Sequence, residues 1–253
     1  MTIDRPTATD EAALKELWKE AFGDTDDFIN LFFRLAYSES NALCVYDNGI
    51  LAAALYWFDG YIENKKVAYI YGVATKKSQR GKGFSSSLIK RTHDLLISCG
   101  YEASLLVPAD EGLFRFYGKL GYISCCPIDC REYTASKDDS DIQKIDAEEY
   151  LRLRKAYLPQ NTLIFDNQRL EFLASINDFY KNDNFILAKN TAYDALTIIE
   201  FFGDKTYIPS VINTLGFEKG TVRSYGNSRP FAMYFPLTDS FKITPESLGF
   251  AFD

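Results

Sequence analysis

The chain has 253 residues, of which 47% are hydrophobic, 15% aromatic and 25% charged, and its formal net charge is -7. This composition is typical of a globular protein with enough apolar side chains for a core, and the length favours two domains. An acidic chain is poorly suited to bind nucleic acid or an anionic membrane surface. A cationic substrate suits this charge better.

The N-terminal residues and the cysteines bear on location and metal binding. Residues 1–13 carry acids and no apolar leader, and no stretch reaches the ~18 consecutive apolar residues of a membrane span, so we expect a cytoplasmic protein. The five cysteines lack paired spacing, which favours reduced thiols. Cys126 and Cys130 could share a metal. Structural zinc takes four ligands, however, and the chain has one histidine, so we expect no metal site.

Helical and extended patterns alternate along the first half of the chain, and Asn48-Gly49 is a strong hairpin signal. The patterns predict, in chain order, a strand at 3–5, helices at 9–22 and 25–36, strands at 42–46, 50–58 and 67–75, a helix at 84–99, a strand at 103–107, a helix at 113–120 and a strand at 122–126. This order indicates an α/β fold, with a mixed, largely antiparallel twisted sheet flanked by helices.

The second half partly repeats this plan after a polar, charged segment at 136–146, which we interpret as a linker. The predicted elements are helices at 147–157, 168–180 and 208–215 and strands at 185–189, 193–202 and 230–235. We therefore expect two domains, 1–135 and 136–253, with the same fold present twice.

A basic, glycine-containing loop follows the strand at 67–75. Residues 76–87 read KKSQRGKGFSSS and lead into the helix at 84–99. Free N–H groups at a helix N-terminus bind anions, and glycines let the backbone approach a ligand closely. The loop therefore predicts a pyrophosphate site, although a solvated charge run in front of an ordinary helix would have the same composition.

Two common phosphate-binding motifs are excluded by spacing. A P-loop needs a glycine at position 76 and a Ser or Thr at position 83, which hold Lys76 and Gly83. The dinucleotide-binding fingerprint needs a third glycine at position 86, which holds Ser86.

The segment Arg80–Ser85 resembles motif A of the GNAT superfamily of N-acetyltransferases, written Gln/Arg-x-x-Gly-x-Gly/Ala, with Ser85 in place of the final small residue. Tyr69–Thr75 stands where the splayed fourth strand of that family lies. Leu113–Tyr122 is similar to the later family helix, which commonly ends Phe-Tyr-x-Lys-x-Gly-Phe. The resemblance covers roughly residues 1–135.

This resemblance implies that the first domain binds acetyl-CoA, or another acyl-CoA, as co-substrate. It implies that the N–H of Val73 faces the thioester oxygen and that Tyr117 is the general acid, although Tyr117 could instead be a core tyrosine. The residues that the resemblance places against the co-substrate are Val73, Thr75, Arg80, Gly81, Lys82, Gly83, Phe84 and Ser85.

The general base is not identified by the sequence. The family often places a glutamate on the splayed strand, but this chain has Tyr69, Ile70 and Tyr71 there. We expect His93 at the edge of the core, and Asp110 and Glu111 in capping roles. One set of aromatic residues could line an acceptor pocket or belong to the core: Phe28, Phe32, Tyr56, Trp57 and Tyr71.

The resemblance implies an N-acyltransferase that acts on a small-molecule or peptidyl amine, with a non-catalytic acyl-CoA-binding regulatory module as the alternative. The sequence is compatible with an oligomer. The second domain resembles the degenerate domain of tandem, enhanced-intracellular-survival type members. It has no basic loop at Gly203–Lys205, so we expect no second acyl-CoA there. The tail at 249–253 is a candidate for the missing base, or else a frayed end.

Overall fold

The computed structural model describes residues 1–165, 170–192, 194–248 and 250. The chain forms two compact units, which we describe separately. The first contains Met1–Ile123, Met233–Ile243 and the short strand at Ile164–Phe165. The second contains Ser124–Leu163, Leu170–Ala232 and the described residues from Thr244 onward.

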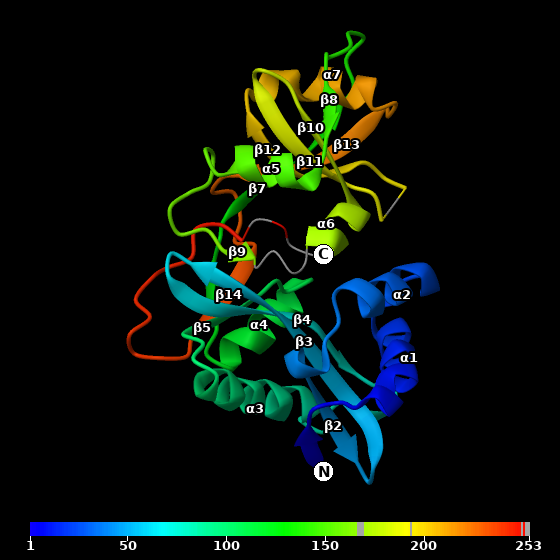
Figure 1. The fold of residues 1–253 in the computed structure, drawn as a ribbon, viewed down its shortest axis with the longest axis vertical. Helices are drawn as coiled ribbons and strands as arrows, with labels where there is room; N and C mark the ends of the chain where they lie inside the picture. The colour runs from blue at the N-terminus through cyan, green and yellow to red at the C-terminus, as the bar shows by residue number, and fades with distance from the viewer. Residues whose placement is uncertain (166–169, 193, 249, 251–253) are drawn as a thin grey trace. The chain divides into compact units, whose positions relative to one another are not determined.

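The first unit is a sheet with helices on both faces (Figure 1). Its elements are β1 (Thr2–Asp4), α1 (Glu11–Phe22), α2 (Asp26–Leu35), β2 (Ala42–Asp47), β3 (Ile50–Ile62), β4 (Lys65–Thr75), the 3-10 helix η3 (Lys77–Gln79), α3 (Phe84–Ser98), β5 (Ala103–Leu106), α4 (Glu111–Lys119), β6 (Ile123–Cys125), β9 (Ile164–Phe165) and β14 (Ala232–Pro236). The strand order is β1-β2-β3-β4-β5-β14-β6, and β9 pairs with β3.

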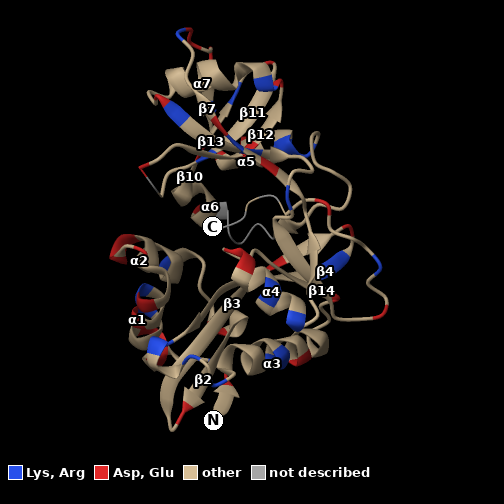
Figure 2. Ribbon diagram, turned by 180° about the vertical axis from the view of Figure 1, so that it is seen from behind, with Lys and Arg blue, Asp and Glu red and all other residues tan. Residues whose placement is uncertain are grey.

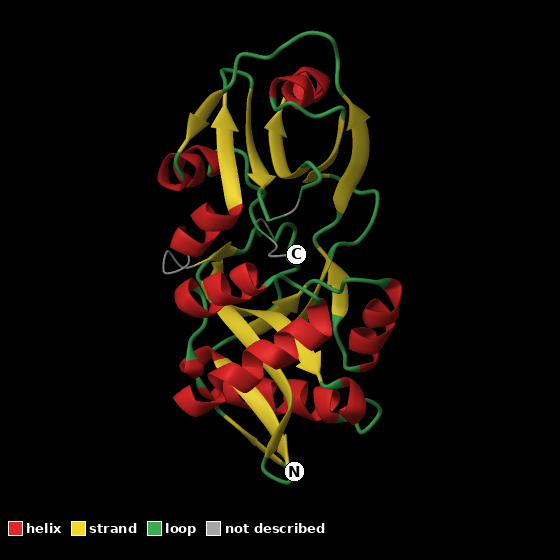
Figure 3. Cartoon of the chain, turned by 90° about the vertical axis from the view of Figure 1, so that its right-hand side faces the viewer, coloured by secondary structure: helices red, strands yellow, loops and turns green. Residues whose placement is uncertain are grey.

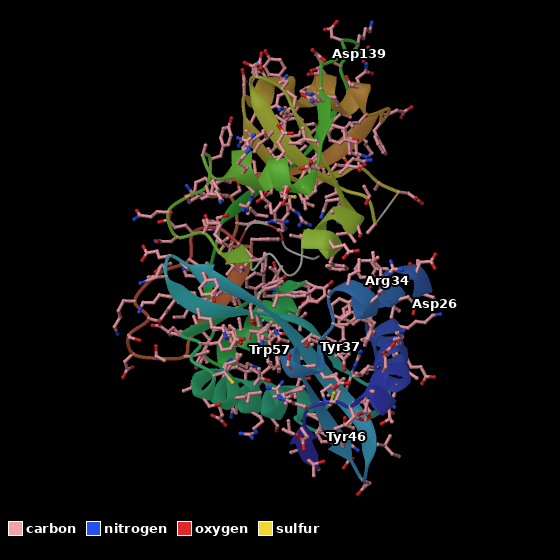
Figure 4. All side chains as sticks on the ribbon, in the orientation of Figure 1. Asp26, Arg34, Tyr37, Tyr46, Trp57 and Asp139 are labelled. Carbon is pink, nitrogen blue, oxygen red and sulfur yellow. The ribbon has the colours of Figure 1, made fainter. Side chains whose placement is uncertain are left out.

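Alternation along β3 explains how this sheet is covered, because successive side chains of a strand point to opposite faces. Trp57, labelled in Figure 4, belongs to the core cluster that also contains Leu88 of α3 and Tyr117 of α4. Its neighbour Tyr56 contacts Trp18 of α1, with ring centroids 5.5 Å apart. Helices α3 and α4 therefore cover one face and α1 covers the other.

The second unit is built in the same way, with helices against a sheet (Figure 3). Its elements are β7 (Ile128–Thr134), β8 (Gln143–Ile145), α5 (Ala147–Arg154), α6 (Leu170–Ile176), β10 (Asn177–Lys181), β11 (Phe185–Asn190), β12 (Thr197–Gly203), the 3-10 helix η5 (Lys205–Tyr207), α7 (Ile208–Thr214) and β13 (Lys219–Tyr225). The strand order is β7-β13-β12-β11-β10-β8.

The second sheet repeats the strand directions of the first. In the first sheet β1 to β4 are antiparallel neighbours, β4 and β5 are parallel, and β5 pairs antiparallel with β14. In the second, β8, β10, β11 and β12 are antiparallel neighbours, β12 and β13 are parallel, and β13 pairs antiparallel with β7. The α/β fold predicted from the sequence, a mixed twisted sheet flanked by helices, is confirmed.

In each sheet, the strand that pairs with the outer member of the parallel pair comes from the other half of the sequence. β7 comes before the second unit's other elements and completes the second sheet, whereas β14 follows β13 and completes the first. The units therefore do not follow the expected 135/136 boundary, because β7 pairs with β13 along its whole length and Met233–Pro236 pairs with β5.

Two local predictions in the second half are wrong. The segment 136–146 is not only a linker, because β8 lies within it and pairs with β10. The predicted helix at 168–180 stops at Ile176, and Asn177–Lys181 forms a strand because β11 and β8 supply partners on both of its edges.

No helix in the described ranges is long and apolar enough to cross a membrane.

Candidate active site

A β-bulge interrupts β4 where the sequence places Val73. Tyr56 of β3 pairs with Tyr71 and Ala54 pairs with Ala74, so Gly72 and Val73 together face a single residue of β3. Gly72 has a φ of 60°, and an added Cβ would lie 2.9 Å from Cδ2 of Tyr56. A bulge takes the extra residue out of the ladder and redirects its backbone groups. The backbone at Gly72–Val73 is therefore the part of β4 that can present an N–H to a ligand.

Strand β4 also leaves its parallel neighbour at this point. Pairing with β5 runs from Val67↔Ala103 to Tyr69↔Leu105, and β4 then continues to Thr75. Exposure increases from buried at Ile70 to half-buried at Tyr71, Gly72 and Val73. The strand thus has the splayed geometry that the family resemblance predicts, with a backbone edge open to an extended ligand.

The basic loop leads from the end of β4 to the N-terminus of α3. Lys77, Arg80 and Lys82 are exposed and Lys76 is half-buried. Gly83 is the N-cap residue of α3, and no side chain caps this helix end. The first amides of a helix lack intrahelical partners and carry the positive end of the helix dipole. The loop therefore combines uncapped amides with a local excess of cations in an acidic protein.

Both glycines of the loop have left-handed backbone, with φ of 81° at Gly81 and 79° at Gly83. No protein atom lies within 4 Å of an added Cβ at either position. Core packing therefore does not require glycine at these positions. The backbone conformation does, because other residues adopt it at a cost.

Other side chains of the loop hold its shape. The Arg80 Nε donates to the Thr75 carbonyl over 3.3 Å, and the Lys82 Nζ donates to Gln79 Oε1 over 2.6 Å. The hydroxyls of Ser85 and Thr75 lie 2.8 Å apart, so Ser85 ties the start of α3 to the end of β4. The ring of Phe84 is buried in the core. Ser85, the departure from motif A, thus has a structural role in this chain.

Tyr117 lies on α4 and is 6% exposed. Its hydroxyl makes no hydrogen bond with the described residues, and its ring contacts those of Phe116 and Tyr122 at centroid distances of 5.1 and 5.7 Å. Burial raises the pKa of Tyr117 above the ordinary value. The phenol therefore stays protonated at neutral pH and can donate a proton.

His93 is part of a buried hydrogen-bond network and 8% exposed. Its Nε2 lies 2.9 Å from the Tyr122 hydroxyl and 3.2 Å from the Ser104 hydroxyl, and its ring stacks on Phe235 at 4.3 Å. Burial lowers the pKa of His93 to about 4. The imidazole is neutral at pH 7 and its Nε2 has two hydroxyl neighbours in the core, which agrees with the expected edge-of-core position.

Of the two acids near α4, Asp110 has the capping role that the sequence predicts, whereas Glu111 forms an exposed ion pair with Arg115 instead. Asp110 accepts from the Leu113 N–H over 2.8 Å, and Glu111 lies 3.6 Å from Arg115. Glu20 of α1 instead accepts from the Lys77 N–H over 2.5 Å and so connects α1 to the basic loop. No local pattern in the sequence indicates this contact, because the two residues are 57 positions apart.

Most of the aromatic set expected near an acceptor belongs to the core. Phe32, Tyr56 and Trp57 are buried, whereas Phe28 and Tyr71 are half-buried. Phe28 lies in the acidic first turn of α2, which is red in Figure 2. Only these two members of the set can therefore reach a ligand in the first unit without rearrangement of the core.

The second unit repeats the bulge without the phosphate site. In β12, Ile198 pairs with Lys189 and Glu200 with Ala188, which leaves Ile199 as the extra residue. The loop that follows is capped by Asp204, whose carboxylate accepts from the Thr206 N–H over 2.9 Å. These hydrogen bonds hold the pKa of Asp204 below its usual value. A carboxylate thus caps the turn that follows β12, where the first unit has its basic loop, while the N-terminus of α7 has no side-chain cap and contains Pro209.

The space beyond the parallel pair of the second sheet is largely filled. A cavity of about 40 Å³ remains there, lined in part by Ile199, Phe201 and Tyr225. On the far side of β12, Arg154 of α5 makes two hydrogen bonds of 2.7 and 2.6 Å to Glu200, and both side chains are buried. Strand β12 also leaves its parallel neighbour early, because its pairing with β13 is limited to Thr197↔Thr221 and Ile198↔Val222, but only this small cavity remains beside it in the described ranges.

Bulge, splayed strand and uncapped helix together mark a candidate ligand site in the first unit, and comparison with known proteins identifies the family. The family model of the acetyltransferase (GNAT) domain matches residues 2–124. This part of the chain is a GNAT acetyltransferase domain. L-2,4-diaminobutyric acid acetyltransferase of Halalkalibacterium halodurans is 25% identical over 132 residues, which are 51% of this chain and 69% of that protein.

Solved structures show the same fold over a longer range. A GCN5-related N-acetyltransferase from Anabaena variabilis matches with a TM-score of 0.70 at 15% identity, over 94% of this chain and 73% of its own. Eis1 from Mycobacterium abscessus matches with a TM-score of 0.62 at 9% identity, over 94% of this chain and 74% of its own. At these identities the likeness concerns the fold.

Proposed function

We propose that this protein is an acetyl-CoA-dependent N-acetyltransferase whose site lies in the first unit. The observation that carries the proposal is the coincidence, on β4 and α3, of a backbone bulge, a splayed strand edge and an uncapped helix N-terminus beside exposed cations. Each feature suits one part of an acyl-CoA: the thioester, the extended pantetheine arm and the pyrophosphate.

In this proposal the loop from Arg80 to Ser85 binds the pyrophosphate through its amides and cations. Thr75 lies where the β4 edge meets this loop, and Phe84 anchors the start of α3 in the core. Val73 offers its N–H to the thioester oxygen. These roles follow from the family resemblance, and the local geometry supports them.

The reaction would be direct attack of a neutral amine on the thioester carbonyl. As the C–N bond forms and the C–S bond breaks, Tyr117 would protonate the leaving thiolate, for which a phenol that stays neutral at pH 7 is suited. Strand β4 supplies no carboxylate or histidine between Val67 and Thr75. The proton of the attacking amine must therefore leave through water or through a group from another element.

The acceptor is proposed to be a small-molecule or peptidyl amine. The relative from Halalkalibacterium halodurans is named for an amino acid with two amino groups, and the net charge of -7 suits a cationic acceptor. We therefore expect a small amino acid or diamine before a peptide, and we expect neither nucleic acid nor a membrane as partner. A cytoplasmic location and an oligomer are compatible with this proposal.

We further propose that the second unit is a degenerate GNAT-like copy that binds no acyl-CoA. The repeated strand directions and the bulge at Ile199 support common descent. The carboxylate of Asp204 would repel a phosphate at the start of η5, and the filled space beside β12 leaves no slot for a pantetheine arm. The unit would then serve packing or shape the acceptor side.

The tail proposal concerns residues that are mostly outside the described part of the chain. Gly249 and residues 251–253, including the candidate base Asp253, lie outside it, while Phe250 is buried and its ring lies 4.8 Å from the Arg154 guanidinium. Asp253→Asn tests the carboxylate without removing Phe250. Unchanged turnover on a working amine would reject Asp253 as the base.

Two measurements test the main proposal against the non-catalytic alternative, which the absence of a carboxylate on β4 favours. Calorimetric titration with acetyl-CoA reports binding, and thiol release with a panel that includes L-2,4-diaminobutyrate and simple monoamines reports transfer. The proposal expects both. Binding without thiol release from any amine would favour the regulatory module, and no binding would reject both.

A further inference from the structure

The position of the Tyr117 ring depends on its neighbours rather than on a hydrogen bond. Its hydroxyl has no hydrogen-bond partner among the described residues, and its ring is packed edge-on against Tyr122 with an interplanar angle of 64°. A backbone hydrogen bond also links the two residues, because the Tyr122 N–H donates to the Tyr117 carbonyl over 3.1 Å at the end of α4. Tyr122 therefore contacts Tyr117 through both its backbone and its ring.

Tyr122 is itself fixed by a buried network, which we call the Tyr122 network (His93, Ser104 and Tyr122). The Tyr122 hydroxyl lies 2.9 Å from His93 Nε2 and 2.8 Å from Ser104 Oγ. These partners come from α3 and β5, so the network joins the turn after α4 to the helix and the strand that flank the proposed co-substrate site. Such a phenol has little rotational freedom.

The protonation of the Tyr122 network is set by its chemistry. The neutral imidazole can accept at Nε2 when its proton is on Nδ1, so Tyr122 can donate to His93 while it accepts from Ser104. An imidazolium could not accept this bond. Burial keeps His93 neutral, since it lowers the pKa to about 4. The network is therefore intact throughout the neutral range.

A second contact holds the network from the far end of the sequence. Phe235 of β14 stacks on His93 at 4.3 Å and lies 5.6 Å from the Tyr122 ring. An added Cβ on Gly121 would lie 2.9 Å from Cε2 of Phe235, so the turn before Tyr122 is closely packed. Phe235 on strand β14 therefore packs against Tyr122, which in turn packs against Tyr117.

We propose that Tyr122 is a positioning residue for the transfer reaction, held by Ser104 and His93 so that its ring orients Tyr117 toward the departing thiolate. This inference rests on the proposed function. Tyr122 touches no reacting atom in this scheme and acts only through Tyr117. A misplacement of about 1 Å can cost ~10² in rate, so the hydroxyl anchor of Tyr122 matters for turnover although it lies away from the reacting groups.

The test uses Tyr122→Phe, which keeps the ring and removes only the anchored hydroxyl. Tyr101→Phe is the matched control, because Tyr101 is also 4% exposed in the same core and its hydroxyl donates to Asp59 over 2.6 Å. Thiol release gives kcat and KM, and calorimetric titration gives the acetyl-CoA Kd. We expect Tyr122→Phe to lower kcat by about 10 to 10² with an unchanged Kd, and Tyr101→Phe to change neither.

Two further readouts separate positioning from loss of structure. If Tyr117 becomes less buried in Tyr122→Phe, its pKa falls and the alkaline limb of kcat moves to lower pH, whereas Tyr101→Phe should leave this limb in place. In fluorotyrosine-labelled protein, the Tyr117 resonance, assigned by its absence in Tyr117→Phe, should shift in Tyr122→Phe and not in Tyr101→Phe.

The outcomes are distinguishable from failure of the proposed function. If wild type binds acetyl-CoA but releases no thiol, the proposed function fails, and an unshifted Tyr117 resonance in Tyr122→Phe would overturn the positioning role as well. If wild type is active and Tyr117→Phe is slow, wild-type kcat in Tyr122→Phe overturns the inference alone. Equal loss of kcat in Tyr122→Phe and Tyr101→Phe also overturns it, because the effect would then come from the core in general.

Discussion

The buried histidine predicts a specific dependence of stability on pH. Folding lowers the pKa of His93 from 6.5 to about 4, because the ring is buried against Phe235, Tyr122 and Ser104. Between these values the unfolded chain binds more protons than the folded chain, so the stabilisation is present above pH 6.5 and is lost as the pH falls. The shift corresponds to about 3 kcal/mol when complete, and to about 2 kcal/mol at pH 5.

His93→Gln isolates this contribution, since glutamine is uncharged at both pH values and retains a hydrogen-bonding group. Urea unfolding at pH 7 and pH 5, followed by tryptophan fluorescence, gives the free energy of unfolding. Trp18 and Trp57 both lie in the first unit, so the signal reports that unit. Wild type should lose about 2 kcal/mol more than the variant between the two pH values. Equal losses would show that His93 is not held neutral in the folded state.

Three other predictions follow from the site and from the second unit. Tyr117→Phe should retain acetyl-CoA affinity and lower turnover by ~10² to 10⁴, as measured by thiol release; wild-type turnover would make Tyr117 a core residue. Calorimetric titration should give one acetyl-CoA per chain, and two would reject the degenerate second unit. Arg154→Met should destabilise the second unit by about 3 to 5 kcal/mol in urea unfolding followed by circular dichroism, because the buried Glu200 loses its counter-charge and keeps the hydrogen bond from the Tyr150 hydroxyl. The exposed control Arg152→Met should have little effect.

The sequence predicted the first unit well because its signals are local. The Asn48-Gly49 turn acts within a few residues, and the structure has this turn between β2 and β3. The basic loop was found for the same reason, since its cations and glycines are contiguous. The bulge at Gly72 was not predicted, because it depends on pairing with β3 and on contact with Trp18.

The second unit was harder to predict because its strands depend on distant partners. β7 has no fully buried residue, and β13 buries only Gly220 and Val222, so neither shows apolar alternation. β10 was predicted as helix because Phe172, Ile176 and Phe179 continue a helical repeat, but two neighbouring strands pair with Asn177–Lys181. The exchange of β7 and β14 leaves no mark in composition or spacing.

The central claim, an acyl-CoA site on the loop before α3, is tested most directly by acetyl-CoA titration of Gly83→Val beside wild type. Valine at a φ of 79° is strained and would disturb the amides that face the pyrophosphate, while no neighbouring protein atom is displaced. Gly216→Val is the matched control, since Gly216 has a φ of 81° with open space around it and lies in the second unit. The account predicts strongly weakened binding in Gly83→Val alone. Wild-type affinity in Gly83→Val, with an unchanged circular dichroism spectrum, would contradict it.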